Sequence, residues 1–290
     1  MEYLLHILIL ICIYSILSIS LDLLVGHTGV LSITQAGFFG VGAYTSALLS
    51  VTFGISFLPS VLIAAVAAGC LSLLISLPSM RLHEDYFVIA TFAFQLILFS
   101  LFNNWIALTR GPFGITAISR PIVFGWTIQS NASLLLLSLL FLALAYSTVT
   151  LLTTSPFGRV LRAIRGDEIF TMALGKDVMR FKVIAFAVSA ALAASAGALY
   201  AHYMTYIDPS SFTVMESILV ISMIVVGGAG SAWGPLVGAA LLVTVPEVLR
   251  FIGIPSSIAA NTRQIIYGAL LIGILMFRPR GLVGKFGFGR

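Results

Sequence analysis

Charged side chains, the groups best suited to chemistry, are concentrated in one stretch of this chain, RVLRAIRGDEIFTMALGKDVMRFK (residues 159–182). This stretch, which we call the charged island, holds nine of the 25 charged residues in 24 of the 290 positions. Its carboxylates and basic groups suit helix capping, ion pairing and contact with a partner. We therefore expect a docking or positioning role for the island, and no catalytic one.

The rest of the chain lacks the patterns that catalysis or cofactor binding would need. The Gly-Lys pair at 175–176 has Phe170 where a phosphate-binding loop needs its first glycine and Asp177 where it needs a hydroxyl. The glycines of GFFGVG (37–42) lie in an apolar stretch that no strand precedes, so they do not form a dinucleotide fingerprint. The sequence predicts no enzyme, cofactor or metal site, since the histidines and cysteines have no ligand spacing: His6, His27, His83, His202, Cys12 and Cys70.

The composition is that of a membrane protein. Apolar residues make up 60% of the chain and charged residues 9%, against about 25% charged in globular domains, and the mean hydropathy is +1.12. The first 25 residues contain no Lys or Arg, so we expect a retained first span there and not a cleaved signal. The net charge of +5 fits an excess of basic residues on the inner face, and we expect no nucleic-acid partner.

The apolar runs predict an all-α polytopic protein with about nine spans, eight to ten being compatible, in a single transmembrane domain of residues 1–290. Residues 216–228 are short for a span and end in GGAGSAWG, and GHTGVLS (26–32) is also Gly-rich, so either can be a re-entrant element. The predicted spans are 3–25, 34–51, 57–78, 86–108, 132–152, 183–203, 216–228, 235–253 and 264–278.

Orientation follows if residues 153–182 lie in the cytoplasm. Counting spans outward from them places 11 Lys and Arg on the inner side and four on the outer side. Basic residues favour the cytoplasmic side of membrane proteins, so we predict the N-terminus outside and the C-terminus inside. The four outer residues are Arg110, Arg120, Arg250 and Arg263.

Two Gly-rich turns, GHTG (26–29) and GGAG (227–230), each precede a stretch of small residues. Such a pairing suits an internally duplicated transporter core. Equally, glycine and alanine are common wherever membrane helices pack closely. The pattern alone does not choose between the two interpretations.

Local signals predict that the charged island is structured. Nine charges would cost well over ~20 kcal/mol in a membrane centre, so the island must lie in water. Asp167 is a good N-cap, Glu168 suits the positive helix start, and Gly175 can end a helix EIFTMAL over 168–174. A second short helix is predicted before it, with Val160, Leu161 and Ile164 on one face and its end at Gly166.

The helix at 168–174 is apolar over most of its surface, with Ile169, Met172 and Ala173 on one face and Phe170 and Leu174 beside it. A helix of this kind in water is expected to have a partner. The partner can be the membrane surface or a protein with a groove for a short helix. A solvated loop that only fixes topology would explain the arginines but not the caps.

The stretch GDEIFTMALGKDVMRFKVIAFAVSA resembles the cytoplasmic loop of the membrane subunits of ABC importers, which forms a coupling helix that docks on the ATPase subunit. The resemblance implies that Glu168 takes the acidic position, Ala173 an alanine position and Gly175 the glycine, after the cap Asp167. This chain has Phe170, Thr171 and Met172 where small and acidic residues are usual. We expect Phe170 to be the side chain that enters the ATPase groove.

The resemblance extends over nearly the whole chain and is specific to the branched-chain amino-acid importer permeases of the LivM type. It is carried by an ordered set of segments: GHTGVLSITQAGFFGVGAYTSALL (26–49), DYFVIATFAFQLI (85–97), NNW (103–105), RGPFGITAI (110–118), SPFGRVLRAIRGDE (155–168), VVGGAGSAWGPLVGA (225–239) and RQIIYGALLIGILMFRPRGLVG (263–284).

This resemblance implies a permease subunit in a bacterial cytoplasmic membrane that translocates leucine, isoleucine or valine and does no chemistry itself. The implied partners are a second homologous permease, two ATPase subunits that hydrolyse ATP, and an extracytoplasmic binding protein. Gln95 and residues 110–118 differ from the commonest family forms, so a permease for urea, short amides or other small amino acids stays an alternative. A stand-alone secondary transporter is the rival from another class, and it would be expected to place a carboxylate near the midplane.

Polar residues within the predicted spans are functional candidates because they are costly there. We expect Asp22 to anchor the GHTG turn, Glu216 to lie at a helix start, and Glu247 to pair with Arg250. Neutral polar residues commonly hydrogen-bond between membrane helices. Our candidates for lining the substrate path are four such residues: Gln35, Thr91, Gln95 and Asn103.

Overall fold

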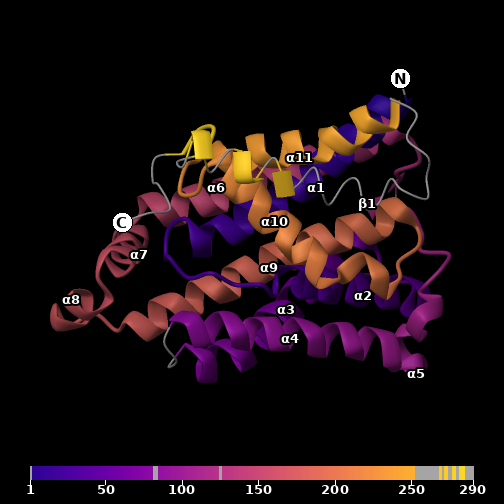
Figure 1. Cartoon of the computed structure of the whole chain (residues 1–290). Coiled ribbons are helices and arrows are strands. Elements are labelled where there is room, and N and C mark those ends of the chain that lie inside the picture. Colours follow the sequence, from indigo (N-terminus) through magenta and orange to yellow (C-terminus); the bar gives the residue numbers. More distant parts are fainter. Residues whose placement is uncertain are drawn as a thin grey trace.

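The protein is a bundle of long helices (Figure 1), seen in a computed structural model that describes residues 2–80, 84–123, 126–251, 268–269, 271–273, 276–278 and 281–284. Six helices are long and apolar enough to cross a membrane. They are α1 (Glu2–Val25), α2 (Gln35–Phe53), α3 (Phe57–Ser79), α4 (Glu84–Asn104), α6 (Asn131–Thr154) and α9 (Val178–Met204). Each coincides with a predicted span to within a few residues, so the predicted all-α polytopic fold is confirmed.

The remaining described elements are short. Two apolar helices follow α9, namely α10 (Val214–Gly227) and α11 (Gly234–Phe251). Of the last predicted span, 264–278, the structure describes only residues 268–269, 271–273 and 276–278. The connections contain α5 (Ile106–Thr109), η1 (Gly111–Phe113), α7 (Pro156–Gly166), α8 (Glu168–Ala173), η2 (Pro209–Phe212) and an antiparallel pair of two-residue strands, β1 (Ile122–Val123) and β2 (Trp126–Thr127).

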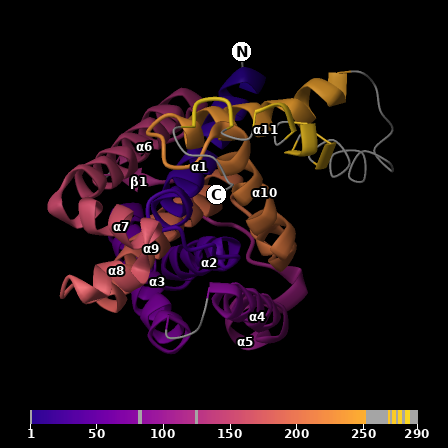
Figure 2. The ribbon, with the colours of Figure 1, turned by 60° about the vertical axis from the view of Figure 1, so that its left-hand side comes forward.

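The N-terminus and α8 lie at opposite ends of the bundle (Figure 1). We call these the N-terminal end and the α8 end. The turned view in Figure 2 shows α1 and α9 inside the bundle, with α6 on one side and α4 on the other. Helices α9, α1 and α2 are the most buried of the six, and α4 and α6 are the least buried.

Small residues allow the central helices to pack closely. A side-chain carbon added at Gly42 of α2 would lie 2.1 Å from the backbone oxygen of Ala194, and one added at Gly197 of α9 would lie 1.9 Å from that of Phe39. The GFFGVGAYTSA stretch therefore lets α2 and α9 touch backbone to backbone. Close van der Waals packing of this kind stabilises helix pairs in lipid, where burial from water adds little.

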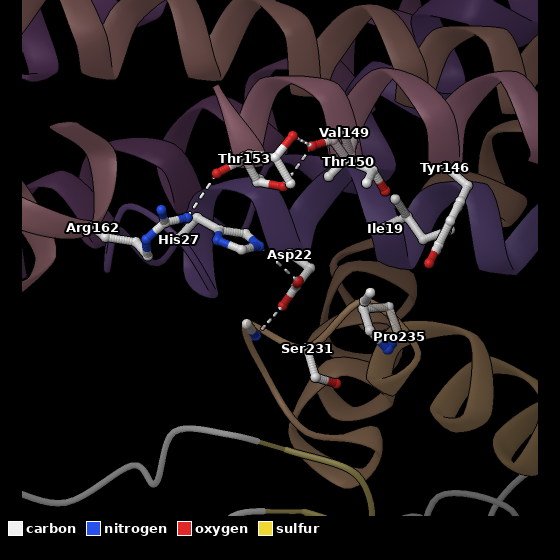
Figure 3. Close-up of a pocket in the computed structure, with 13 residues that line it drawn as sticks. Ile19, Asp22, His27, Tyr146, Val149, Thr150, Thr153, Arg162, Ser231 and Pro235 are labelled. Carbon is white, nitrogen blue, oxygen red and sulfur yellow. Dashed lines mark hydrogen bonds and ion pairs between the residues drawn. The ribbon is translucent and has the colours of Figure 1, made fainter. Parts of the chain in front are cut away.

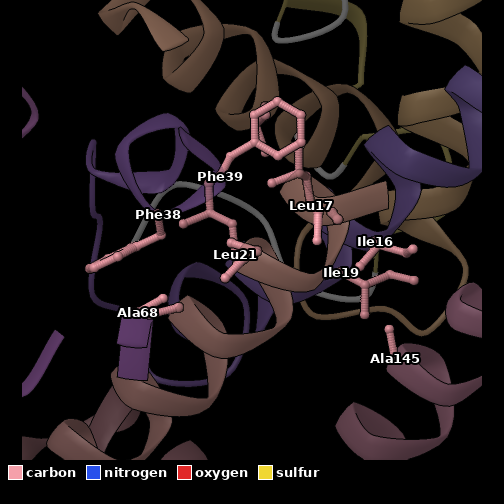
Figure 4. Close-up of a cluster of buried hydrophobic side chains, with 14 of the residues drawn as sticks. Ile16, Leu17, Ile19, Leu21, Phe38, Phe39, Ala68 and Ala145 are labelled. Atoms are coloured by element: carbon pink, nitrogen blue, oxygen red, sulfur yellow. The ribbon is translucent and has the colours of Figure 1, made fainter. Parts of the chain in front are cut away.

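Larger apolar side chains fill the space around this contact. Figure 4 shows Leu17 and Leu21 of α1 beside Phe38 and Phe39 of α2, and the ring of Phe38 meets that of Phe186 on α9 edge to face at 5.5 Å. On the outer helices, large apolar side chains instead point away from the protein, including Leu62, Val66, Leu74, Ile89, Ile97, Leu136 and Leu140. A protein apolar both inside and outside is suited to a bilayer.

Helix α10 is shorter than a full span and begins inside the bundle. It has 14 residues and extends over about 21 Å, less than the ~30 Å hydrocarbon core. Its start lies about halfway along α1, because Tyr14 of α1 donates a 3.2 Å hydrogen bond to Glu216 in its first turn. The start of α2 meets it there, where the backbone N–H of Ala36 donates to Ser217 Oγ at 3.0 Å. Glu216 lies at a helix start as predicted, but that start is about halfway along α1 and not at the outer end of a span, where we expected it.

Candidate functional site

The first helix of the charged island, α7, is fixed to the bundle. Ser155 takes the N-cap position and Pro156 the first helical position, where a missing N–H costs nothing. Leu161 and Ile164 are buried as their spacing predicts, and the helix ends at Gly166 as expected. These contacts hold α7 against the ends of the membrane helices.

The second helix, α8, forms from the predicted local signals. Asp167 Oδ1 accepts a 2.9 Å hydrogen bond from the backbone N–H of Phe170, and Glu168 occupies the first turn. The helix ends at Ala173, one residue earlier than predicted, since Leu174 takes the cap position. Gly175 then adopts φ +76°, a conformation that disfavours any other residue.

Helix α8 presents its apolar side chains away from the bundle. Ile169 is 77% exposed and Phe170 62% exposed, and Ala173 is exposed as well. Met172 and Leu174 belong to the same exposed set, whereas Thr171 is buried. Unlike the exposed side chains of α3, α4 and α6, these lie beyond the ends of the membrane helices (Figure 1). Helix α8 therefore leaves an apolar surface uncovered at its end of the bundle.

A partly buried ion pair ties α8 to α9. Lys182 Nζ donates to Glu168 Oε2 at 2.5 Å, and the Lys182 side chain is only 7% exposed. Glu168 therefore holds α8 against α9, in addition to occupying the acidic position of the loop pattern. The sequence placed both residues in the island but gave no sign of this pairing, because the partners are 14 residues apart and meet only when α9 turns back.

Asp22 lies at the α8 end of α1 and joins the two Gly-rich turns. Its Oδ1 accepts a 2.8 Å hydrogen bond from the backbone N–H of Gly230, and the carboxylate is almost fully buried. We predicted that Asp22 anchors the first turn, and its backbone oxygen does accept from the N–H of Gly26 at 2.7 Å. The bond to the second turn was not predicted.

Two arginines of α7 reach toward the same region. Arg165 donates through Nη1 to the backbone oxygen of Gly26, and its charge attracts that of Asp22. Arg162 donates through Nη1 to the backbone oxygen of Thr153 at 2.7 Å. The island is thereby joined both to the first Gly-rich turn and to the end of α6.

A cavity of about 310 Å³ lies among these groups (Figure 3). Asp22, His27 and Arg162 line one part of it, and Ile19, Val149 and Pro235 form an apolar part. Figure 3 shows His27 between Asp22 and Arg162, with Ser231 below Asp22. The cavity is therefore bounded by segments that converge at the α8 end.

The electrostatics of this region keep His27 neutral. Burial, together with the positive charges of Arg162 and Arg165, lowers the pKa of His27 to about 4. Asp22 Oδ2 lies 3.8 Å from His27 Nε2 and would favour a charged imidazole, but the opposing effects are larger. At neutral pH the imidazole in this contact is thus uncharged.

Three of the four predicted path residues are brought together inside the bundle. Gln95 Oε1 accepts from the N–H of Gly37 at 2.6 Å, and Gln95 Nε2 donates to the backbone oxygen of Phe212 at 2.9 Å. Thr91 Oγ1 accepts from the N–H of Ile33 at 3.2 Å. Gln35 Nε2 donates to Ser20 Oγ at 2.5 Å, so all three side chains connect separate segments. The structure thus gives them bonds between helices and turns, the usual use of such residues.

Asn103 does not belong to this cluster. It lies eight residues beyond Gln95 on α4, about 12 Å further along the helix, and is half-buried. Glu247 accepts a hydrogen bond from Tyr3, while the side chain of its predicted partner, Arg250, lies outside the described residues. Within the described ranges, no three His, Cys, Asp or Glu side chains are grouped in a way that could hold a metal ion.

The family described as "Branched-chain amino acid transport system / permease component" matches residues 3–275, nearly the whole chain. The chain belongs to this permease family. It is 34% identical to the high-affinity branched-chain amino acid transport system permease protein LivM of Escherichia coli K12, over 93% of this chain and 68% of the relative. The predicted membership of the LivM-type permeases is therefore confirmed, and the chain is the permease component of a transport system.

More distant relatives belong to two permease types. A probable LivM protein of Methanocaldococcus jannaschii is 26% identical over 93% of this chain and 90% of the relative. The LivH permease of Salmonella typhimurium is 23% identical over 94% of this chain and 91% of the relative. No solved structure matches the chain.

Sequence reasoning missed Arg165 and Lys182, which attach the island to the helices and turns around it, and Gly230, which binds Asp22. One signal was available. A basic residue that recurs every three positions at 159, 162 and 165 places a charged row along α7 beside its buried face. The partners of Arg165 are the backbone oxygen of Gly26 and the carboxylate of Asp22. Both are more than 130 residues away in the chain, so no local pattern reveals them.

Proposed function

We propose that this chain is the membrane-spanning subunit of an ATP-binding-cassette importer for the branched-chain amino acids leucine, isoleucine and valine. The observation that carries the proposal is α8, a capped helix whose apolar side chains are exposed at one end of a membrane bundle. Such a helix suits a groove on a partner protein. The names of the LivM relatives, which are branched-chain amino acid permeases, support the substrate class.

The proposed partners follow from this assignment. Two ATPase subunits lie on the cytoplasmic side, and one of them binds α8. Phe170 is the side chain that enters its groove, and the helix that presents it is shaped by Asp167, Glu168, Ala173 and Gly175. A second, homologous permease completes the membrane part, and the similarity of the chain to both LivM and LivH proteins supports a pair of related subunits. A binding protein delivers substrate from outside.

We further propose that the N-terminus faces outward and the C-terminus inward, in the inner membrane. The excess of basic residues at the α8 end supports this orientation. The described residues near the C-terminus lie with that end, since the N–H of Val283 donates to the backbone oxygen of Gly227 at 2.9 Å. Residues 1–290 act as one transmembrane domain, in which 153–182 form the cytoplasmic coupling loop.

In the proposed mechanism, ATP binding closes the ATPase dimer and displaces α8. The motion changes the packing of the spans and switches access from one side of the membrane to the other. The substrate path is bordered by four residues: Gln35, Thr91, Gln95 and Asn103. The first three also hold the starts of α2 and α10 in place. The chain does no chemistry, because hydrolysis takes place on the partner subunits.

The proposal is tested by reconstituting the complete complex in liposomes and measuring leucine uptake and ATP hydrolysis with leucine-loaded binding protein. We expect loaded binding protein to stimulate both activities in the wild type. The double change Glu168→Arg, Gly175→Glu should abolish the stimulation. Uptake of urea or a short amide in place of leucine would contradict the substrate, and leucine uptake without ATP would contradict the class.

A matched control separates docking from backbone strain. Gly54 ends α2 at the opposite end of the bundle with φ +64°, and both it and Gly175 have open space where a side chain would go. Gly54→Glu therefore repeats the chemical change and the local strain of Gly175→Glu away from α8. We expect Gly54→Glu to keep the stimulation, whereas its loss in both variants would contradict a specific role of α8.

A further inference from the structure

The buried carboxylate of Asp22 connects two turns that each follow the end of a helix. It accepts from the N–H of Gly230, which follows the end of α10, and it lies directly over Gly26, which follows the end of α1. A buried carboxylate costs several kcal/mol unless its charge and lone pairs are satisfied. The partners here are the Gly230 N–H and the positive charge of Arg165.

Gly26 has no room for a side chain where the two Gly-rich turns meet. A side-chain carbon added at Gly26 would lie 2.2 Å from Asp22 Oδ1 and 2.4 Å from the backbone nitrogen of Gly230. Close-packed groups of this kind transmit a displacement because they cannot be compressed. If the first turn shifts, the second must shift with it or lose its hydrogen bond to Asp22.

Arg165 connects this junction to the cytoplasmic loop. It lies in the last turn of α7, two residues before Asp167, which caps α8. Its guanidinium donates to the backbone oxygen of Gly26, and its side-chain stem packs on Gly29, where an added carbon would lie 3.0 Å from Arg165 Cγ. A movement of α7 is therefore passed to the first turn through one side chain.

The two turns are connected to helices that meet inside the membrane. The first turn leads into α2 and the second follows α10, and the starts of these helices are bonded through Ala36 and Ser217. The series of contacts thus runs from α7 through Arg165 and Asp22 to both helices. Each step in it is a hydrogen bond or a close contact between named atoms.

We infer that Asp22 and Arg165 are positioning residues that couple movement of the cytoplasmic loop to α2 and α10 during transport. The inference rests on the proposed function, because it assumes that a partner moves the loop. Neither residue is required to contact substrate. Their effect is to keep the two Gly-rich turns and α7 moving as one unit.

The first test needs neither substrate nor ATP. Hydrogen exchange is measured on the purified permease–ATPase complex for peptides covering 227–232, in the wild type and in Arg165→Met. Arg165 donates to the first turn, so faster exchange in the second turn reports transmission through Asp22. We expect at least roughly threefold faster exchange. Unchanged exchange in 227–232 would overturn the inference that Arg165 acts on the second turn through Asp22.

Arg159→Met is the matched control. Arg159 lies on the same helix six residues earlier and is exposed, so the substitution removes the same charge without touching the first turn. Exchange in 227–232 should equal that of the wild type. An equal acceleration in Arg159→Met would show a general effect of island charge and would also overturn the inference.

The second test measures leucine transported per ATP hydrolysed by the reconstituted complex. Asp22→Asn keeps an acceptor for the Gly230 N–H but removes the charge that attracts Arg165. We expect this ratio to fall about fivefold or more in Asp22→Asn and in Arg165→Met. The double variant should be no worse than the worse single variant, because both changes break one connection. Unchanged ratios, or effects that multiply, would contradict the pairing.

The two tests fail in different ways. If the wild-type complex does not couple leucine uptake to ATP, the proposed function fails, while the exchange test still decides whether Arg165 communicates with the second turn. If Asp22→Asn does not assemble, Arg165→Met alone decides the outcome, since it changes a side chain on a helix outside the membrane segment.

Discussion

Helices α7 and α8 are neighbours in the chain, yet they relate to the rest of the molecule in opposite ways. Leu161 and Ile164 of α7 are buried against the bundle, whereas Ile169 and Phe170 of α8 are more than half exposed. Arg162 and Arg165 of α7 donate to backbone oxygens of other segments, and α8 is held mainly by its cap and by the Glu168–Lys182 pair. The loop is thus divided into a part attached to the membrane helices and a part left available to a partner.

The largest expected effect concerns the exposed helix. Phe170→Glu places a charge where we propose an apolar groove closes over the ring, and an unpaired buried charge costs about 4 kcal/mol. Binding of the ATPase subunits should weaken by roughly a thousandfold, measured with purified subunits in detergent. Phe113→Glu changes another exposed phenylalanine, in η1 next to α5, which lies at the opposite end of the bundle from α8, and should bind as the wild type does. Equal weakening by both variants would count against α8.

The second prediction contrasts burial in the two helices. Leu161→Ala removes a fully buried side chain of α7 and should destabilise the fold by about 3 kcal/mol. Ile169→Ala on α8 should change stability by less than about 0.5 kcal/mol, because the side chain is exposed. Unfolding by SDS titration in mixed micelles measures both. Similar losses would mean that α8 is also packed against the bundle.

The third prediction concerns the pair that holds α8 to α9. Glu168→Gln leaves the ammonium of Lys182 buried without its counter-charge, although Glu168 itself is 34% exposed and partly screened. We expect a loss of about 2 to 3 kcal/mol in the same titration. The further change Lys182→Met should restore most of it, since it removes the unpaired charge. No recovery in the double variant would show that the pair is not the cause.

The fourth prediction concerns pH and the surroundings of α7. The folded protein holds His27 neutral with a pKa of about 4, below the ordinary value near 6.5, so the unfolded chain binds the proton first as pH falls. The contribution of neutral His27 to the free energy of unfolding is fully present above about pH 6.5. It should fall by about 2 kcal/mol by pH 5. Comparing wild type with His27→Gln at pH 7.5 and 5.0 isolates the effect. An identical pH dependence in both proteins would contradict the burial of a neutral His27.

The smallest effect is expected at the cap of α8. Asp167→Ala removes the acceptor for the N–H of Phe170 and should cost about 1 kcal/mol of local stability. Hydrogen exchange of 168–174 should accelerate while exchange of 156–166 does not change. Asp167→Asn, which keeps an acceptor, should behave nearly as the wild type. Acceleration in both helices would show that α7 and α8 unfold together.

What could be predicted from the sequence depended on local signals. The limits of the long helices follow from runs of apolar residues, and the α8 cap follows from an aspartate, a glutamate and a glycine at helix spacing. These features depend on contacts within a few residues. They could be recognised without knowing how the helices pack.

What could not be predicted depends on contacts between distant segments. Asp22 was expected to serve the turn that follows it, and its additional bond to Gly230 spans 208 positions of the chain. Gln95 was a path candidate, and the structure uses both ends of its amide to connect α2 with the segment before α10. The periodic pattern of apolar residues in the sequence does not predict such pairs, because they form only when the helices pack into the bundle.

The division of the cytoplasmic loop is tested most directly by hydrogen exchange of the permease with and without its ATPase subunits. We predict that residues 156–166 exchange slowly in both states and that residues 168–176 become protected only when the ATPase is bound. Protection of 156–166 on binding, with no change in 168–176, would contradict this division.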